Sequence, residues 1–309
     1  MRNNDATALT HKLQDGRTLG YAEYGDRSGF PIFLFHGTPG SRLWFLQDDP
    51  MAKALGIRLI ATDRPGYGLS DKKAGRTVLD YPQDIKELAD HLDIHQFSVI
   101  GTSGGSPYAA ACAYSLPNRV VFCGMVAGIN QFEKQRPPQE MCKENQTAFF
   151  LSKYFPFLVR MTLSYGKKLM LTDPEKYIRT VQTQIKHLCP TDQEIMKREE
   201  SGAHVLMHMK EALRNGVREA ASEPALLANP WGFKMSQIKT VVHIWHGMSD
   251  TLAPVQPVMK MAEEIPSCST HFIEGKGHFL DADEQVWTEI LKSVSPPSYI
   301  SHTQSSEKI

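Results

Sequence analysis

Short apolar runs recur along the chain and alternate with segments whose apolar side chains repeat at helical spacing. Almost continuous apolar runs bounded by glycine, proline or polar residues are typical of parallel strands that are buried on both faces. We therefore predict a buried strand at each of these positions: Pro31–Phe35, Ile57–Ala61, Phe97–Ile100, Val120–Val126, Thr240–Trp245 and His271–Ile273.

The first two runs of the chain have a different pattern. Ala8–Gln14 and Thr18–Tyr24 alternate apolar and polar residues, and Asp15-Gly16 lies between them. Asp-Gly between two alternating runs is a strong signal for a β-hairpin. The chain is therefore expected to open with antiparallel edge strands.

The segments between the buried strands have helical periodicity. From Thr77 to Leu92, for example, Ile85, Leu88 and Ala89 fall on one helical face. Strands that alternate with helices predict an α/β fold with a mostly parallel, doubly wound sheet and helices on both of its faces. The other predicted helices are Ser41 to about Leu55, with Ser41 as its N-terminal cap, Tyr108–Tyr114, about Val255 to Glu264 and about Ala282 to Val294.

The alternation stops at about Asn130 and resumes at about Ser236. Between them the pattern is helical, prolines divide it, and aromatic residues cluster from Phe149 to Phe157, which we interpret as internal packing. We therefore predict an α/β core formed by residues 1–129 and 236–294, with residues 130–235 inserted as a helical lid over the carboxyl edge of the sheet, where such sheets bind ligands. Residues 295–309 are predicted to be a flexible tail.

Composition narrows the class of protein. The chain has 309 residues, 41% of them hydrophobic, and its 34 basic and 34 acidic residues give a formal net charge of zero. No global field favours nucleic acid or an anionic membrane, and no apolar run is long enough to span a bilayer. The five cysteines are scattered and without a Cys-x-x-Cys pair, which is typical of a reducing, cytoplasmic compartment. The sequence does not indicate an oligomeric state.

The first candidate catalytic motif is Gly101-Thr102-Ser103-Gly104-Gly105, which lies between a predicted strand and a predicted helix. A strand that enters a helix through Gly-x-Ser-x-Gly forms a nucleophile elbow. The turn is so tight that side chains two residues before and after the serine would meet the neighbouring strand and helix. Ser103 is therefore predicted to be a nucleophile with an exposed hydroxyl, at a helix N-terminus that favours negative charge.

A serine nucleophile needs a base, and the base needs an acid that orients it. Asp250 and His278 each follow a predicted strand, in the chain order Ser, Asp, His that this elbow uses. Taken alone, Asp250 would be a helix cap and His278 a polar loop residue. Because three such residues follow three separate strands at one sheet edge, we predict a catalytic triad.

These motifs resemble the α/β-hydrolase superfamily, in its lidded serine esterase and lipase-like branch. The resemblance implies Ser103 as nucleophile, His278 as general base and then acid, and Asp250 as the residue that holds the imidazole. It also implies an oxyanion hole formed by the backbone N–H groups of Thr38 and Gly104. The matching segments are His36-Gly37-Thr38-Pro39-Gly40, Asp63-Arg64-Pro65-Gly66-Tyr67-Gly68-Leu69-Ser70, the elbow, the loop with Asp250, and Gly277-His278-Phe279.

Other residues in and near these motifs are expected to have structural roles. We expect His36 to brace the oxyanion loop, and Asp63 and Arg64 to tie loops together. His204 and His208 are four residues apart on a predicted helix, but no third ligand is evident, so we assign them to the surface or interior of the lid. No metal or cofactor is predicted.

The function predicted from these residues is hydrolysis of carboxylic esters with small to medium acyl chains, through an acyl-enzyme. Trp44, Phe149 and Phe150 are candidates for the substrate pocket. Proline iminopeptidases share the His-Gly-x-Pro-Gly loop, but they usually have Gly-Gly-Ser-Trp-Gly at the elbow, which differs from this chain. Lactonase, thioesterase, C–C hydrolase and perhydrolase activities remain open, as does a ligand receptor built on the same fold.

Overall fold

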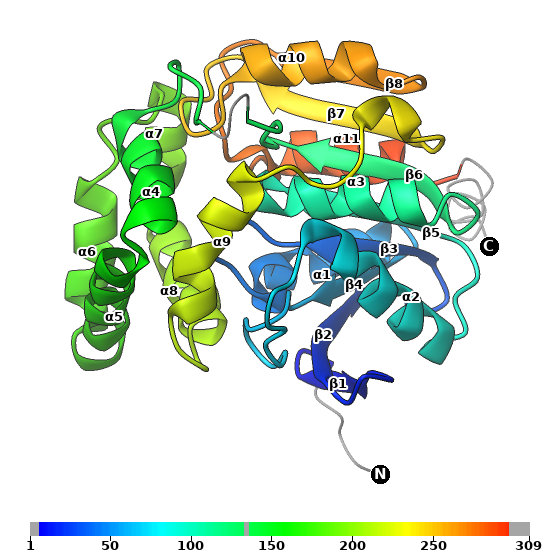
Figure 1. Ribbon diagram of the computed structural model, residues 1–309, viewed down its shortest axis with the longest axis horizontal. Helices are drawn as coiled ribbons and strands as arrows, with labels where there is room; N and C mark the ends of the chain where they lie inside the picture. The colour runs from blue at the N-terminus through cyan, green and yellow to red at the C-terminus, as the bar shows by residue number, and fades with distance from the viewer. Residues whose placement is uncertain (1–5, 133–135, 297–309) are drawn as a thin grey trace, which may run out of the picture.

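The computed structural model describes residues 6–132 and 136–296. Eight strands form one sheet in the order β1-β2-β4-β3-β5-β6-β7-β8 (Figure 1). The β1–β2 and β2–β4 pairs are antiparallel, and every other pair is parallel. The strands are β1 Leu9–Lys12, β2 Thr18–Gly25, β3 Phe30–Phe35, β4 Ile57–Thr62, β5 Phe97–Thr102, β6 Val120–Val126, β7 Val241–Gly247 and β8 Cys268–Ile273.

Helices lie on both faces of this sheet and beyond one end of it (Figure 1). Their order along the chain confirms the predicted α/β alternation up to β6 and again from β7. The helices are α1 Asp49–Ala54, α2 Tyr81–His91, α3 Ser106–Ser115, α4 Lys143–Tyr154, α5 Pro156–Thr172, α6 Pro174–Thr183, α7 Pro190–Lys197, α8 Glu199–Ala212, α9 Arg218–Ala228, α10 Val255–Glu264 and α11 Glu284–Ser293.

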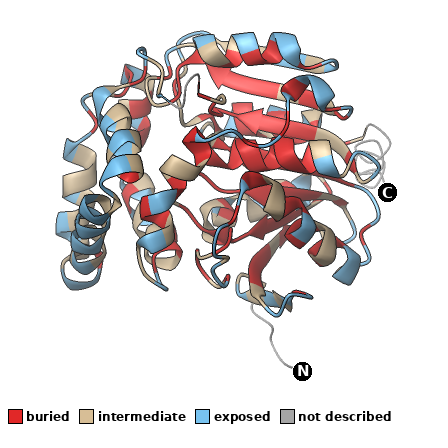
Figure 2. Cartoon of the chain, viewed as in Figure 1, coloured by how far each residue is buried: buried red, intermediate tan, exposed pale blue. Residues whose placement is uncertain are grey.

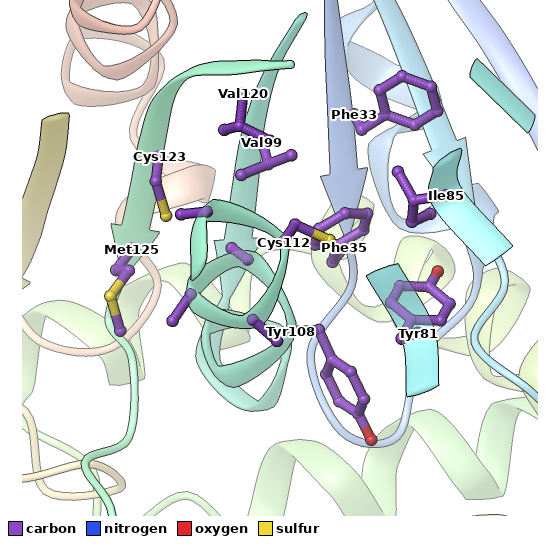
Figure 3. Packing of buried hydrophobic residues seen from close by; sticks show 14 of the residues in the cluster. Phe33, Phe35, Tyr81, Ile85, Val99, Tyr108, Cys112, Val120, Cys123 and Met125 are labelled. Atoms are coloured by element: carbon purple, nitrogen blue, oxygen red, sulfur yellow. The ribbon is translucent and has the colours of Figure 1, made fainter. Parts of the chain in front are cut away.

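The two faces of the sheet bury separate apolar cores. Phe33 and Phe35 of β3 pack with residues of α2, α3 and α10, whereas Ile32 and Leu34 pack with residues of α1 and α11. Successive side chains of a strand point to opposite faces, so a continuously apolar strand supplies both cores. Figure 3 shows the first core, in which rings from β3 and α2 meet the small side chains of α3. The doubly wound sheet is thus confirmed.

The predicted N-terminal hairpin is confirmed. Leu9 pairs with Tyr21 and Lys12 pairs with Thr18 in the antiparallel register. Gly16 lies in the turn at φ +86°, a left-handed conformation that glycine adopts without steric cost.

The predicted helix from Ser41 to Leu55 is confirmed only in part, because it is not one continuous α-helix. The chain forms a 3₁₀ helix at Arg42–Asp48, with Phe45 outside helical geometry, and then the short helix α1. Ser41 does not cap it, because its hydroxyl donates instead to the carbonyl of His208, at 3.0 Å. This long-range contact outweighs the local capping preference.

The helices α4 to α9 all lie between β6 and β7, and we call residues 130–235 the helical insertion. These helices pack mainly on one another and extend beyond the end of the sheet (Figure 1). Two of the insertion's side chains, Asp192 and Glu223, also bond to loops of the core. No helix within residues 6–132 and 136–296 is long and apolar enough to cross a membrane.

The interpretation of the aromatic cluster as internal packing is wrong for most of its members. Phe149 packs against Phe132, but Phe150, Tyr154, Phe155 and Phe157 are exposed to solvent. Figure 2 shows the exposed positions along α4 and α5 at the outer end of the insertion. The predicted tail lies outside the described residues beyond position 296, and Ser295 still bonds to the carbonyl of Leu291.

Candidate active site

The turn between β5 and α3 explains the glycines of the elbow. Ser103 has φ +52°, a left-handed conformation that is strained for any residue with a side chain. A Cβ on Gly101 would lie 2.3 Å from the carbonyl oxygen of Gly105, and a Cβ on Gly105 would lie 2.2 Å from that of Phe35. Both distances are far below contact, so the predicted crowding at the two positions is present.

Three loops at the carboxyl edge of the sheet bring Ser103, Asp250 and His278 together. The Nε2 atom of His278 is 3.0 Å from the Oγ of Ser103, and its Nδ1 is 2.7 Å from the Oδ2 of Asp250. The side chain of Asp250 is fully buried and that of His278 is 10% exposed. The three residues predicted from sequence therefore form one continuous chain of hydrogen bonds.

Asp250 is held as a carboxylate. Its Oδ1 accepts from the backbone N–H groups of Leu252 and Ala253, at 2.8 and 2.9 Å, and Oδ2 also lies 3.4 Å from Nε2 of His246. Burial alone would raise the pKa of Asp250, but His278 and His246 lower it far below its usual value. Asp250 therefore fixes its own loop as well as the imidazole, and it does not cap α10, whose N-cap is Pro254.

The candidate oxyanion loop lies directly over the elbow. A Cβ built on Gly104 would lie 2.3 Å from Oγ1 of Thr38, and one on Gly37 would lie 3.5 Å from Cβ of Ser103. Within the described part of the chain, the backbone N–H of Thr38 does not donate to another backbone group. His36 braces the loop through Nδ1, which is 2.8 Å from the carbonyl oxygen of Gly37.

A buried carboxylate of the insertion, Glu223 of α9, holds this loop from the other side. Its Oε2 accepts from Thr38 Oγ1 at 2.9 Å, Arg64 Nη2 at 2.8 Å and Tyr67 OH at 2.7 Å. Its Oε1 accepts from Arg64 Nε, Arg76 Nη2 and Tyr108 OH. Burial opposes ionisation, but the two arginines lower the pKa of Glu223 well below its usual value.

Arg64 connects this carboxylate to the oxyanion loop. Its guanidinium also donates to the carbonyl oxygens of His36 and Gly37. Asp63 accepts from Arg42 and from the backbone N–H of Leu69. The predicted structural roles of His36, Asp63 and Arg64 agree with these contacts. Glu223 was not predicted, because it does not belong to any of the sequence motifs.

A second carboxylate of the insertion contacts the histidine loop. Asp192 of α7 accepts from the backbone N–H of His278 at 2.8 Å and of Phe279 at 3.3 Å. A Cβ on Gly277 would lie 2.1 Å from Asp192 Oδ2, so glycine at this position allows the close approach. The sequence analysis did not predict a role for Asp192, which lies in the first turn of α7 after Pro190.

The candidates for the substrate pocket separate into two places. Trp44 lies against Gly37, and its indole N–H donates to Asp281 at the wall of a cavity of about 740 Å³. Phe149 and Phe150 line another cavity, of about 520 Å³, and within the described residues neither cavity is lined by Ser103, Asp250 or His278. The structure thus places Trp44 near the triad, and the substrate roles of all three residues stay predictions.

His204 and His208 lie side by side on α8, with ring centroids 5.3 Å apart. Burial and the neighbouring His204 lower the pKa of His208 to about 3, so its imidazole is neutral. Among the described residues, no group of three or more His, Cys, Asp or Glu could hold a metal ion.

Comparison with curated proteins finds relatives with several different activities. Over 129 residues, 39% of this chain and 44% of the relative, the sequence is 33% identical to a non-heme chloroperoxidase of Streptomyces lividans. It is 33% identical to a proline iminopeptidase of Arabidopsis thaliana over 118 residues, 35% of this chain and 29% of the relative. A 2-hydroxy-6-oxononadienedioate/2-hydroxy-6-oxononatrienedioate hydrolase of Burkholderia vietnamiensis is 26% identical over 80% of both chains. The chain thus spans less than half of the first two relatives.

Solved structures and a family model extend the similarity to most of the chain. A hydrolase from Pseudomonas aeruginosa PA01 superposes with a TM-score of 0.67 at 15% identity, covering 95% of this chain and 99% of that one. The esterase RhEst1 from Rhodococcus sp. ECU1013 gives a TM-score of 0.66 at 19% identity, covering 96% and 98%. The model described as alpha/beta hydrolase fold matches residues 31–284. The chain therefore belongs to the α/β hydrolase fold family.

Proposed function

We propose that this hydrolase is a serine esterase that cleaves carboxylic esters with small to medium acyl chains, with Ser103, His278 and Asp250 as its catalytic triad. The hydrogen-bonded chain from Ser103 Oγ through His278 to Asp250 carries this proposal. Esterases among the solved structures of similar fold agree with it.

In the proposed mechanism, Nε2 of His278 takes the proton of Ser103 while the serine oxygen attacks the ester carbonyl. The carbonyl oxygen becomes an oxyanion that accepts from the backbone N–H groups of Thr38 and Gly104. His278 then gives its proton to the departing alcohol, which leaves an acyl-enzyme on Ser103. Water repeats the sequence with His278 as base, releases the acid and restores the serine. Asp250 keeps Nδ1 protonated, so that Nε2 faces Ser103 as an acceptor.

We further propose that the helical insertion acts as a lid over this edge of the sheet. Its side chains Asp192 and Glu223 contact the histidine loop and the oxyanion loop, so the insertion and the catalytic loops are connected on both sides of the triad. Trp44, Phe149 and Phe150 remain candidates for the walls of the substrate pocket.

Labelling with a fluorophosphonate tests the nucleophile directly. We expect covalent modification of Ser103, located by mass spectrometry, and hydrolysis of p-nitrophenyl esters from acetate to decanoate with a preference for the shorter chains. An enzyme that is not labelled, or a label on another serine, would contradict the assignment. Labelling of Ser103 without turnover of any ester would favour the receptor hypothesis.

The pH profile tests the proposed base. Burial alone would lower the pKa of His278, but Asp250 raises it above its usual value of about 6.5. Since only the neutral imidazole can accept the proton of Ser103, kcat/KM for a non-ionisable ester should rise as the pH passes from about 6 to about 8 and then level off. A flat profile over that interval at constant ionic strength would exclude His278 as the base.

Peptide hydrolysis is the second candidate function. The similarity to a plant proline iminopeptidase supports it, and the same triad would attack an amide carbonyl as it attacks an ester. We therefore include proline p-nitroanilide among the substrates. Turnover of this amide faster than of any ester would replace the esterase proposal while keeping the triad.

A further inference from the structure

The exposed large apolar side chains that the structure describes come from one part of the chain. Within the described residues they all lie between Phe150 and Leu171, on α4 and α5 at the outer end of the helical insertion (Figures 1 and 2). Isolated exposed apolar residues are common on protein surfaces, but a contiguous group of them marks an interaction site. We call these eight residues the apolar face: Phe150, Tyr154, Phe155, Phe157, Leu158, Met161, Tyr165 and Leu171.

The apolar face follows a helical stripe on α5. Phe157, Met161 and Tyr165 succeed one another every four residues and so lie on the same side of the helix, where Met161 and Tyr165 are 65% and 64% exposed. On the other side of α5, Leu163 and Met170 pack into the interior of the insertion. The helix is thus apolar on both sides, although only its inner side is covered by protein.

The segment that carries most of this face is basic, although Asp173 and Glu175 follow it directly in the sequence. Between Asn145 and Thr172 the sequence has four basic residues, Lys153, Arg160, Lys167 and Lys168, and no Asp or Glu. The chain as a whole has a formal net charge of zero, so acidic residues in other parts of the sequence balance the positive charge of this segment. Aromatic and aliphatic side chains interspersed with Lys and Arg are characteristic of helices that lie in a membrane interface.

We propose that the apolar face docks on the surface of a lipid bilayer with anionic headgroups. The basic residues beside the apolar face favour an anionic bilayer over a second copy of the chain as its partner. A symmetric dimer would place the same patch against itself and so bring the basic residues of both copies together. An anionic bilayer instead attracts them and accepts the aromatic rings at the level of its headgroups.

The docking site lies on the outer side of the insertion. The inner side includes α9, which contacts α4 and α5 and carries Glu223. Because the α5 residues of the apolar face include neither a triad residue nor a candidate for the substrate pocket, docking through them is independent of the esterase proposal and is measured without turnover.

Sedimentation with vesicles of phosphatidylcholine, with or without one-third phosphatidylglycerol, tests the proposal. The wild-type protein should bind the anionic vesicles about tenfold more strongly than the neutral ones at low salt, and the difference should shrink as salt is added. A wild-type protein that binds neither kind of vesicle would overturn the proposal.

Two variants assign the binding to this surface. The triple variant Phe157→Gln, Met161→Gln, Tyr165→Gln should lose about tenfold or more of the binding to anionic vesicles, because the apolar contact is removed while glutamine keeps the helix propensity. The double variant Arg160→Gln, Lys168→Gln should lose about tenfold on anionic vesicles and little on neutral ones.

The matched control is Lys260→Gln, Lys292→Gln, which removes two exposed lysines from α10 and α11 of the core. It should bind anionic vesicles within about twofold of the wild-type protein. Equal losses in the control and the α5 double variant would overturn the proposal, and this comparison stands even where the triple variant does not fold. Concentration-dependent dimerisation that the triple variant abolishes, without vesicle binding by the wild type, would assign the face to a second copy.

Discussion

Replacing Ser103 by alanine is expected to lower kcat for p-nitrophenyl acetate by about 10⁵–10⁶, the loss that follows removal of the nucleophile from a Ser-His-Asp triad. Without Oγ, no acyl-enzyme forms, and His278 has no hydroxyl to deprotonate. Steady-state hydrolysis and fluorophosphonate labelling should disappear together. Alanine occupies the same left-handed backbone position as serine, so the thermal midpoint should stay close to that of the wild-type protein.

Ser249→Ala is the matched control for this experiment. Ser249 is an exposed serine in the loop that carries Asp250, at the same edge of the sheet. The control should keep both wild-type turnover and labelling. If Ser103→Ala kept a tenth or more of the activity, or if both alanine variants lost it equally, Ser103 would not be the nucleophile.

The core, and the three residues that the structure joins in one chain of hydrogen bonds, could be predicted because both follow from local patterns. A strand such as Phe30–Phe35 that is buried on both sides must be continuously apolar, and the register of the parallel sheet then aligns the ends of β5, β7 and β8 at one edge. Ser103 sits in a turn that only glycines can flank, so its position is marked by sequence.

The contacts of the insertion could not be predicted in the same way. Glu223 lies 185 residues from Thr38 and 159 from Arg64 along the chain, within an ordinary helical segment. Only the packing of α9 over the oxyanion loop shows that this glutamate is buried. The aromatic residues of α5 show the opposite case, because an apolar helix has the same sequence pattern whether protein covers its outer side or not.

Substitution of Glu223 by glutamine is expected to lower the free energy of unfolding by about 3–5 kcal/mol, the usual cost of removing one partner from a buried ion pair. The carboxylate accepts six hydrogen bonds, and the side chains of Arg64 and Glu223 are both fully buried. A glutamine amide turns one acceptor into a donor that faces other donors and leaves Arg64 and Arg76 without a buried counter-charge. Urea unfolding at neutral pH measures the loss.

The same substitution should act on turnover, because Thr38 and Arg64 bind the oxyanion loop to this carboxylate. We expect kcat to fall by about tenfold, less than the 10²–10³ for a missing oxyanion donor, with KM nearly unchanged. Glu219→Gln is the matched control, since Glu219 lies one turn earlier on α9 and its Oε2 is 3.7 Å from Arg76 Nε. It should cost less than about 1 kcal/mol and leave kcat unchanged.

Because the pKa of Glu223 is held well below its usual range, the stabilisation of the folded protein by this residue depends on pH. Its stabilisation is present above the pKa of an unfolded glutamate, about 4.3, and is lost as the pH falls toward the folded value. The difference in unfolding free energy between wild type and Glu223→Gln should therefore narrow in acid. A difference that is constant with pH, or equal losses in the two glutamine variants, would show that the ionised carboxylate does not hold α9 to the oxyanion loop.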